Sequence, residues 1–180
     1  FRRVLFRSEV EALRSASLVF TERLHRNRLL VVGDINQSES KRLIELTASA
    51  VRNWADTPEL WFKPHPGSPS HSEMAMKLGF SVTTDTLPKI APGLVLAVVG
   101  VAGAASVDLT LLGVPVITML DAGTPNLSPL AGISNARFAR SASQLSEFIR
   151  MPQLHRISAD RLATRSDPPL RWLDVIKSTR

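Results

Sequence analysis

Two basic side chains stand between prolines directly after a short apolar run. Lys63 and His65 each precede a proline, in the order Lys63-Pro64-His65-Pro66, and the apolar residues 60–62 come just before them. Each proline fixes its own φ and keeps the preceding residue out of the helical region, so the segment is stiff and extended. A cation and an imidazole held at a strand end make a candidate phosphate site. The alternative is a strand end that carries two solvated polar groups.

A second candidate site is the run of small residues Gly103-Ala104-Ala105-Ser106, which leads into a predicted helix. Small residues let a ligand approach the backbone, and the first turn of a helix offers N–H groups without intrahelical partners. Ser106 is interpreted as the N-cap or as a donor to a phosphate. Asp108 either complements the helix dipole or accepts hydrogen bonds from ribose hydroxyls. Helix starts rich in Gly and Ala are common, so this pattern alone is a weak indicator.

The segment 121–130 is a third candidate, because it is too long and polar for a simple connection. Long loops at the ligand edge of a sheet are often functional. Asn126 and Ser128 are expected to contact a sugar or a nucleobase, and a surface loop capped by its own Asx turns is the alternative. His71 follows His65 in the same region, but no third ligand is evident, so no metal site is predicted.

Alternating strands and helices must position these residues. Short runs rich in Val, Leu and Ile predict strands, and apolar residues at helical spacing predict helices. The expected strands span 28–33, 59–62, 80–83, 94–99, 114–120 and 137–139. The expected helices span 9–25, 38–54 with Ser38 as N-cap, 72–78 with Ser70 or Ser72 as N-cap, 106–112 ended by Gly113, and 142–150. This order predicts an α/β fold: a Rossmann-like parallel sheet with helices on both faces and ligands beyond the carboxyl ends of the strands.

Composition is typical of one globular domain. The chain has 180 residues, of which 44% are hydrophobic and 21% are charged. The absence of cysteine excludes disulfides and Cys-ligated metal sites, and it fits a cytoplasmic protein. No apolar run in the sequence reaches the roughly 20 residues that a membrane-spanning helix needs.

The first residues are interpreted separately from the rest. Residues 1–8 resemble the translated read-through of a sequencing adapter and are expected to be an artefact. Without Arg2, Arg3 and Arg7 the formal net charge falls from +6 to +3, and aromatic residues are only 6% of the chain, which disfavours a nucleic-acid partner. Residues 9–27 are expected to form a linking helix from an N-terminal domain that this sequence lacks. Residues 28–150 are expected to form the ligand-binding domain, and 151–180 a C-terminal tail.

Two motifs together resemble a known family. The KPHP segment (63–66) and SVDLTLLGVPVI (106–117) resemble the C-terminal, donor-binding half of bacterial GT-B glycosyltransferases. NLSPL (126–130) narrows the resemblance to surface-carbohydrate biosynthesis proteins of lipopolysaccharide and capsule loci. The resemblance covers roughly 28–149 and extends loosely to 171–173. The KPHP motif is shared with transferases of sialic acid and Kdo, which use CMP-activated donors.

The resemblance implies a role for each candidate residue. Lys63 and His65 would bind the donor phosphate, with His65 stabilising the charge that builds on the leaving group. Ser106 would add a phosphate hydrogen bond, and Asp108 would contact the nucleotide ribose. The residues expected to bind substrate are Lys63, Pro66, Gly103, Ala105, Ser106, Asp108, Asn126 and Ser128, with His65 as the catalytic residue.

The function implied is transfer of a sugar from a nucleotide-activated donor to a surface polysaccharide or lipopolysaccharide acceptor. The acceptor, a glycan or lipid-linked molecule, would bind an N-terminal domain, and the whole protein would work in the cytoplasm at the inner face of the membrane. No cofactor and no metal are expected. Related sequences often carry a hydroxyl pair before the helix, where this chain has Gly103 and Ala104. Two alternatives stay open: a nucleotide-sugar epimerase or polyol-phosphate transferase on the same scaffold, and a non-catalytic nucleotide-sugar-binding module.

Overall fold

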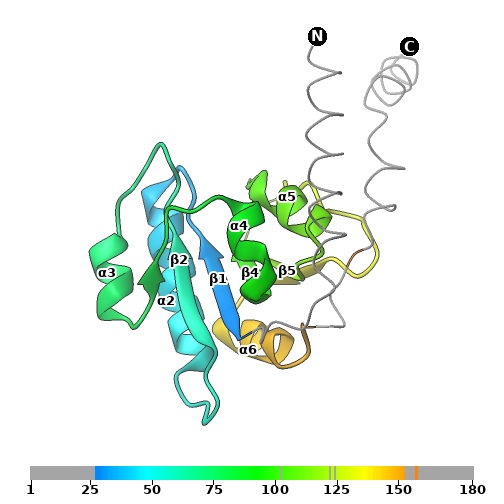
Figure 1. The fold of residues 1–180 in the computed structure, drawn as a ribbon. Coiled ribbons are helices and arrows are strands. Elements are labelled where there is room, and N and C mark those ends of the chain that lie inside the picture. The colour runs from blue at the N-terminus through cyan, green and yellow to red at the C-terminus, as the bar shows by residue number, and fades with distance from the viewer. Residues whose placement is uncertain (1–26, 102, 122, 124, 153–156, 158–180) are drawn as a thin grey trace, which may run out of the picture.

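The computed structural model describes residues 27–101, 103–121, 123, 125–152 and 157 (Figure 1). The expectations for residues 1–8, for the linking helix 9–27 except Asn27, and for most of the tail 151–180 lie outside the described residues.

Six parallel strands form one sheet in the order β3-β2-β1-β4-β5-β6 (Figure 1). Their bounds are Arg28–Val32 (β1), Glu59–Lys63 (β2), Ser81–Val82 (β3), Leu94–Val99 (β4), Val116–Met119 (β5) and Arg137–Ala139 (β6). The central strands β1 and β4 are the most apolar, because both of their faces are covered. The predicted parallel sheet is therefore confirmed.

Helices cover both faces of the sheet. Their bounds are Gln37–Val51 (α2), Ser72–Lys77 (α3), Leu87–Ile90 (α4), Ala105–Leu111 (α5) and Ala142–Arg150 (α6), with a 3-10 turn at Ala91–Gly93 (η2). Residues of α2 and α6 pack with Leu29 and Val31 of β1 in one buried cluster. Residues of α4 and α5 pack with Leu30 in a second cluster on the opposite face. Because successive strand residues point to opposite faces, β1 serves both layers of the core.

The structure corrects three predicted N-caps. His71, not Ser70 or Ser72, occupies the N-cap position of α3 and makes no side-chain cap. Asn36, not Ser38, caps α2: its side-chain oxygen accepts a hydrogen bond from the Ser38 N–H at 3.0 Å. Ala104, not Ser106, occupies the N-cap position of α5 and makes no side-chain cap. The helix that contains Ser106 ends as predicted, with Gly113 in the left-handed region at φ 72°.

The two short helical segments α4 and η2 are not predicted by the sequence patterns. Pro88 and Pro92 make this region look extended, yet each proline stands in the first turn of its segment. Proline is favourable there, because its missing N–H would have no intrahelical partner anyway. Within the described ranges, no helix is long and apolar enough to cross a membrane.

Candidate functional site

The carboxyl edge of the sheet gathers the candidate residues. β1 leads into α2 on one face, and β4 leads into α5 on the opposite face, so the chain diverges between these neighbouring strands. Such a divergence is where ligands bind in open parallel sheets. β2 and β4 lie on either side of β1, so the segments 63–66 and 103–108 leave the same edge with one strand between them. Two strand spacings put the ends of β2 and β4 about 10 Å apart.

The segment that carries Lys63 and His65 is fixed by backbone contacts with the end of β1. The Gly33 N–H donates to the Lys63 carbonyl oxygen at 2.8 Å. A methyl group on Gly33 would lie 3.1 Å from the His65 nitrogen of the main chain and 3.2 Å from the Phe62 ring. The close approach of β1 and β2 therefore depends on glycine at position 33. The same contact fixes the main chain at the start of the segment that contains Pro64 and Pro66.

The imidazole of His65 has a defined orientation. The Gly67 N–H donates to Nδ1 at 3.1 Å, and the Ser68 N–H donates to the His65 carbonyl oxygen at 2.9 Å. Because Nδ1 accepts a hydrogen bond, the neutral ring carries its proton on Nε2. The half-buried side chain is thus a fixed donor. Pro66, in the same turn, is exposed.

Lys63 is directed toward the neighbouring edge strand. Its Nζ donates to the Thr84 carbonyl oxygen at 3.4 Å, just after β3. This long, single hydrogen bond holds the ammonium group at the carboxyl edge and leaves it further donors. The structure places Lys63 and His65 on the same short segment, as the sequence requires, with their polar groups fixed by different partners.

Ser106 is placed differently from its predicted role. Its side chain has no exposed surface, and its hydroxyl donates to the Gly103 carbonyl oxygen at 2.8 Å. The hydroxyl therefore stabilises the turn between β4 and α5. A hydrogen bond from Ser106 to a phosphate stays a prediction, because the hydroxyl would first have to break its bond to Gly103. Ala105 begins α5 and is half-buried, and Asp108 lies in the first turn of that helix, also half-buried.

The loop that follows β5 contains an Asx turn of its own, which is the alternative that the sequence left open to ligand contact. The Asn126 side-chain oxygen accepts from the Ser128 N–H at 3.1 Å, which is an Asx turn. Ser128 is only 5% exposed; its hydroxyl oxygen accepts from the Leu130 N–H at 3.2 Å and lies 3.5 Å from the Thr118 hydroxyl. Ser128 therefore anchors the loop to β5, while Asn126 is exposed. Contact of either with a ligand stays a prediction.

Two charged residues at the same edge, Glu39 and Arg42, were missed by sequence reasoning, and Arg42 reaches Asp121 at the start of the candidate loop 121–130. Glu39 and Arg42 of α2 form a two-pronged ion pair, with nitrogen–oxygen distances of 2.7 and 2.8 Å, and Arg42 also lies 3.3 Å from Asp121. The hydrogen bond to Glu39, aided by attraction to Glu39 and Asp121, outweighs burial and raises the pKa of the Arg42 guanidinium. Their i,i+3 spacing is a visible signal for the first pair, but nothing in the sequence links Arg42 to Asp121.

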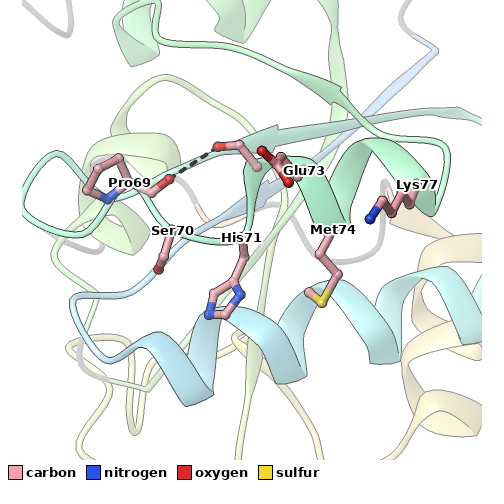
Figure 2. Close-up of a pocket in the computed structure, with 7 residues that line it drawn as sticks. Pro69, Ser70, His71, Glu73, Met74 and Lys77 are labelled. Carbon is pink, nitrogen blue, oxygen red and sulfur yellow. Dashed lines mark hydrogen bonds between the residues drawn. The ribbon is translucent and has the colours of Figure 1, made fainter.

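A hollow of about 560 Å³ is lined by residues between 69 and 77, which belong to the end of the β2–α3 connection and to α3 (Figure 2). In Figure 2 the side chains of His71 and Met74 point toward α2, and the Ser72 hydroxyl donates to the Pro69 carbonyl oxygen at 3.3 Å. His71 has a φ of 71°, and its Nε2 is buried without a hydrogen-bond partner among the described residues. The described part of the chain holds no group of three or more acidic, His or Cys side chains that could bind a metal.

Several solved structures share this fold. TarM matches with a TM-score of 0.62 and 11% identity, over 86% of this chain and 36% of TarM. MurG of Acinetobacter baumannii matches with a TM-score of 0.56 and 16% identity, over 92% of this chain and 53% of MurG. WaaG, a glycosyltransferase involved in lipopolysaccharide biosynthesis, matches with a TM-score of 0.53 and 17% identity, over 89% of this chain and 47% of WaaG.

The matches show the architecture. The chain spans about half or less of each of these proteins, and the described sheet has the fold of one Rossmann-like half of a GT-B protein. No protein-family profile matches the chain, and no curated protein matches its sequence.

Proposed function

We propose that this chain is the donor-binding half of a glycosyltransferase that takes its sugar from a nucleotide-activated donor. The observation that carries the proposal is the fixed His65 imidazole at the carboxyl edge, with Nδ1 occupied by the Gly67 N–H and Nε2 left as the donor. The shared fold with WaaG and the other GT-B structures supports it, because the edge where those parallel strands end is the expected ligand edge.

In this proposal the work of the chain is electrostatic. The His65 Nε2–H donates to an oxygen of the donor phosphate, and the Lys63 ammonium adds a positive charge on the same segment. As the bond between sugar and phosphate breaks, negative charge grows on the leaving phosphate. Groups whose positions are already fixed stabilise that charge without reorganising. Asp108 and Asn126 are proposed to contact the nucleoside or the sugar, and Gly103 and Ala105 to allow close approach to the backbone.

The finer assignments belong to the same proposal. The KPHP segment favours a CMP-linked donor, and the NLSPL segment favours an acceptor of the lipopolysaccharide or capsule class. The acceptor would bind a second domain, and the whole protein would act in the cytoplasm at the inner face of the membrane. Residues 28–150 are proposed as the donor domain.

A second candidate is a non-catalytic module that binds a nucleotide sugar. Gly103 and Ala104 have no hydroxyl, and the hydroxyl of Ser106 is turned inward to Gly103. The turn before α5 therefore offers no side-chain donor in this conformation. This observation favours binding of a nucleotide sugar without turnover.

The test is calorimetric titration of the chain with CMP, UDP and GDP. His65→Asn is the informative variant, because an Asn side chain can still accept from the N–H two residues on and so keep the turn, while the ring donor is lost. We expect about a tenfold or larger loss of affinity, the effect of one charge-assisted hydrogen bond. Circular dichroism provides the folding control. Unchanged affinity in His65→Asn would reject the assignment.

Turnover separates the two candidates. Full-length protein that contains this chain, incubated with the nucleotide sugar and an acceptor glycan, should form a new glycosidic bond if it is a transferase. Nucleotide binding with no product supports the non-catalytic module. A free isomerised sugar nucleotide would instead identify an epimerase.

A further inference from the structure

Arg42 joins two segments at the carboxyl edge of the sheet, helix α2 and the residues that follow β5. Its guanidinium donates to both carboxylate oxygens of Glu39 on the same helix. It also lies 3.3 Å from an Asp121 carboxylate oxygen and donates to the Leu120 carbonyl oxygen at 3.5 Å. Asp121 is also held from the other side, because Arg140 donates to its carbonyl oxygen at 3.0 Å. The start of the β5–β6 loop is thus fixed between two guanidinium groups.

The same edge carries carboxylates close to the turn after β4. A Cβ on Gly100 would lie 3.1 Å from a carboxylate oxygen of Asp34 and 3.3 Å from one of Glu39. Gly100 therefore lets two acidic side chains approach the backbone at the point where β1 and β4 diverge. With Asp121, these make three negative charges around the expected position of an anionic ligand.

Arg42 offsets two of them, Glu39 and Asp121. Its side chain is 22% exposed and that of Glu39 is 17% exposed, so solvent screens this pair less than a surface pair. The bidentate geometry turns both Glu39 oxygens toward the guanidinium. Without Arg42, the Glu39 carboxylate would stand unneutralised against Gly100, next to a site proposed to hold phosphate.

We propose that Arg42 is a positioning residue that makes the carboxyl edge accept an anion, by neutralising Glu39 and by holding the start of the β5–β6 loop at Asp121. The charge effect rests on the proposed function, and the loop effect does not. Among the described residues Arg42 contacts Glu39, Leu120 and Asp121, so it is proposed to act on a ligand through them.

Three variants separate the two effects. Arg42→Met removes the cation and keeps an aliphatic stem of similar reach. Lys41→Met removes the same formal charge one position along α2, where the ammonium group of Lys41 makes an exposed contact with Glu45 at 3.9 Å. The double variant Glu39→Gln with Arg42→Met removes both members of the pair, so the local charge balance returns while the contact with Asp121 stays lost.

Hydrogen exchange of the unliganded chain measures the loop effect. We expect faster exchange in residues 120–136 in Arg42→Met and in the double variant, and wild-type exchange in Lys41→Met. Thermal unfolding of all variants shows whether the change is local. Wild-type exchange in Arg42→Met overturns the proposal, whether or not any nucleotide binds.

Titration with CMP, UDP and GDP measures the charge effect. One uncompensated carboxylate near a phosphate predicts about a five- to tenfold loss of affinity in Arg42→Met at low salt, a smaller loss at high salt, and recovery in the double variant. Lys41→Met should bind like wild type. Equal affinity of Arg42→Met and wild type, or no recovery in the double variant, overturns the charge effect. If wild type binds none of the three nucleotides, the proposed function fails, and the exchange result alone decides the positioning role of Arg42.

Discussion

Replacing Gly33 by alanine should damage the fold and the candidate site together. The added methyl group would lie 3.1 Å from the His65 main-chain nitrogen, 3.2 Å from the Phe62 ring and 3.3 Å from the Lys63 carbonyl oxygen. Two of these three atoms belong to the backbone at and just after the end of β2, so they cannot move away by a rotamer change. The φ of Gly33 is outside the left-handed region, so the penalty comes from crowding alone.

The expected magnitude follows from this crowding. Forcing one methyl group into a closely packed site costs about 1–3 kcal/mol of unfolding free energy. Relief requires β2 to move from β1 by a few tenths of an ångström, which lengthens the 2.8 Å hydrogen bond from Gly33 to Lys63. The same movement shifts His65, so nucleotide affinity should fall with stability.

Urea unfolding followed by circular dichroism measures this cost, with Gly103→Ala as the matched control. A Cβ on Gly103 would meet only the Gly100 carbonyl oxygen, at 3.6 Å, which is an ordinary contact. We expect the control to stay within about 0.5 kcal/mol of wild type. If Gly33→Ala is as stable as Gly103→Ala, the described approach of β1 and β2 is wrong.

Two further substitutions test local features. His71→Asn should raise the unfolding free energy by about 0.5–1 kcal/mol, because asparagine tolerates a φ of 71° better and the buried, unpartnered Nε2 is removed. A lower melting temperature of this variant would contradict the inference that the backbone at His71 is strained. Trp54→Phe should lower the unfolding free energy by about 1 kcal/mol through loss of the 3.2 Å hydrogen bond from its Nε1 to the Ser146 hydroxyl. Denaturant titration that shows no loss in Trp54→Phe would mean that this link between the segment after α2 and helix α6 does not contribute to stability.

The strands were predictable because their composition reports burial. Val and Leu fill most positions on both faces of β1 and β4, and the predicted range 94–99 coincides with β4. Boundaries were less certain where two residues can do the same task. Asn36 and Ser38 are both good N-caps, and only the backbone of the preceding turn decides that Asn36 is used. The short segments α4 and η2, which carry Pro88 and Pro92 in their first turns, have too few residues to show periodicity.

The candidate site was less predictable than the sheet. The sequence places Lys63 and His65 at a strand end, and the structure agrees, because prolines and the apolar run constrain the backbone there. Small hydroxyl residues near turns are ambiguous, because they bond as readily to neighbouring backbone as to a ligand. Ser106 and Ser128 both do the former in this structure. The contact of Arg42 with Asp121 joins distant parts of the chain, so no local pattern reveals it.

The strand order has a consequence for how the chain can be divided. β3 lies at one edge and β4 in the centre, so the link through α4 and η2 carries the chain back past β2 and β1. A break in this link leaves two fragments of three strands each, with open apolar edges at β1 and β4. Either fragment alone would present an aggregation-prone template. Co-expressed, the two fragments can close both edges by rejoining through the β1–β4 register, which makes this link the natural place to split the domain.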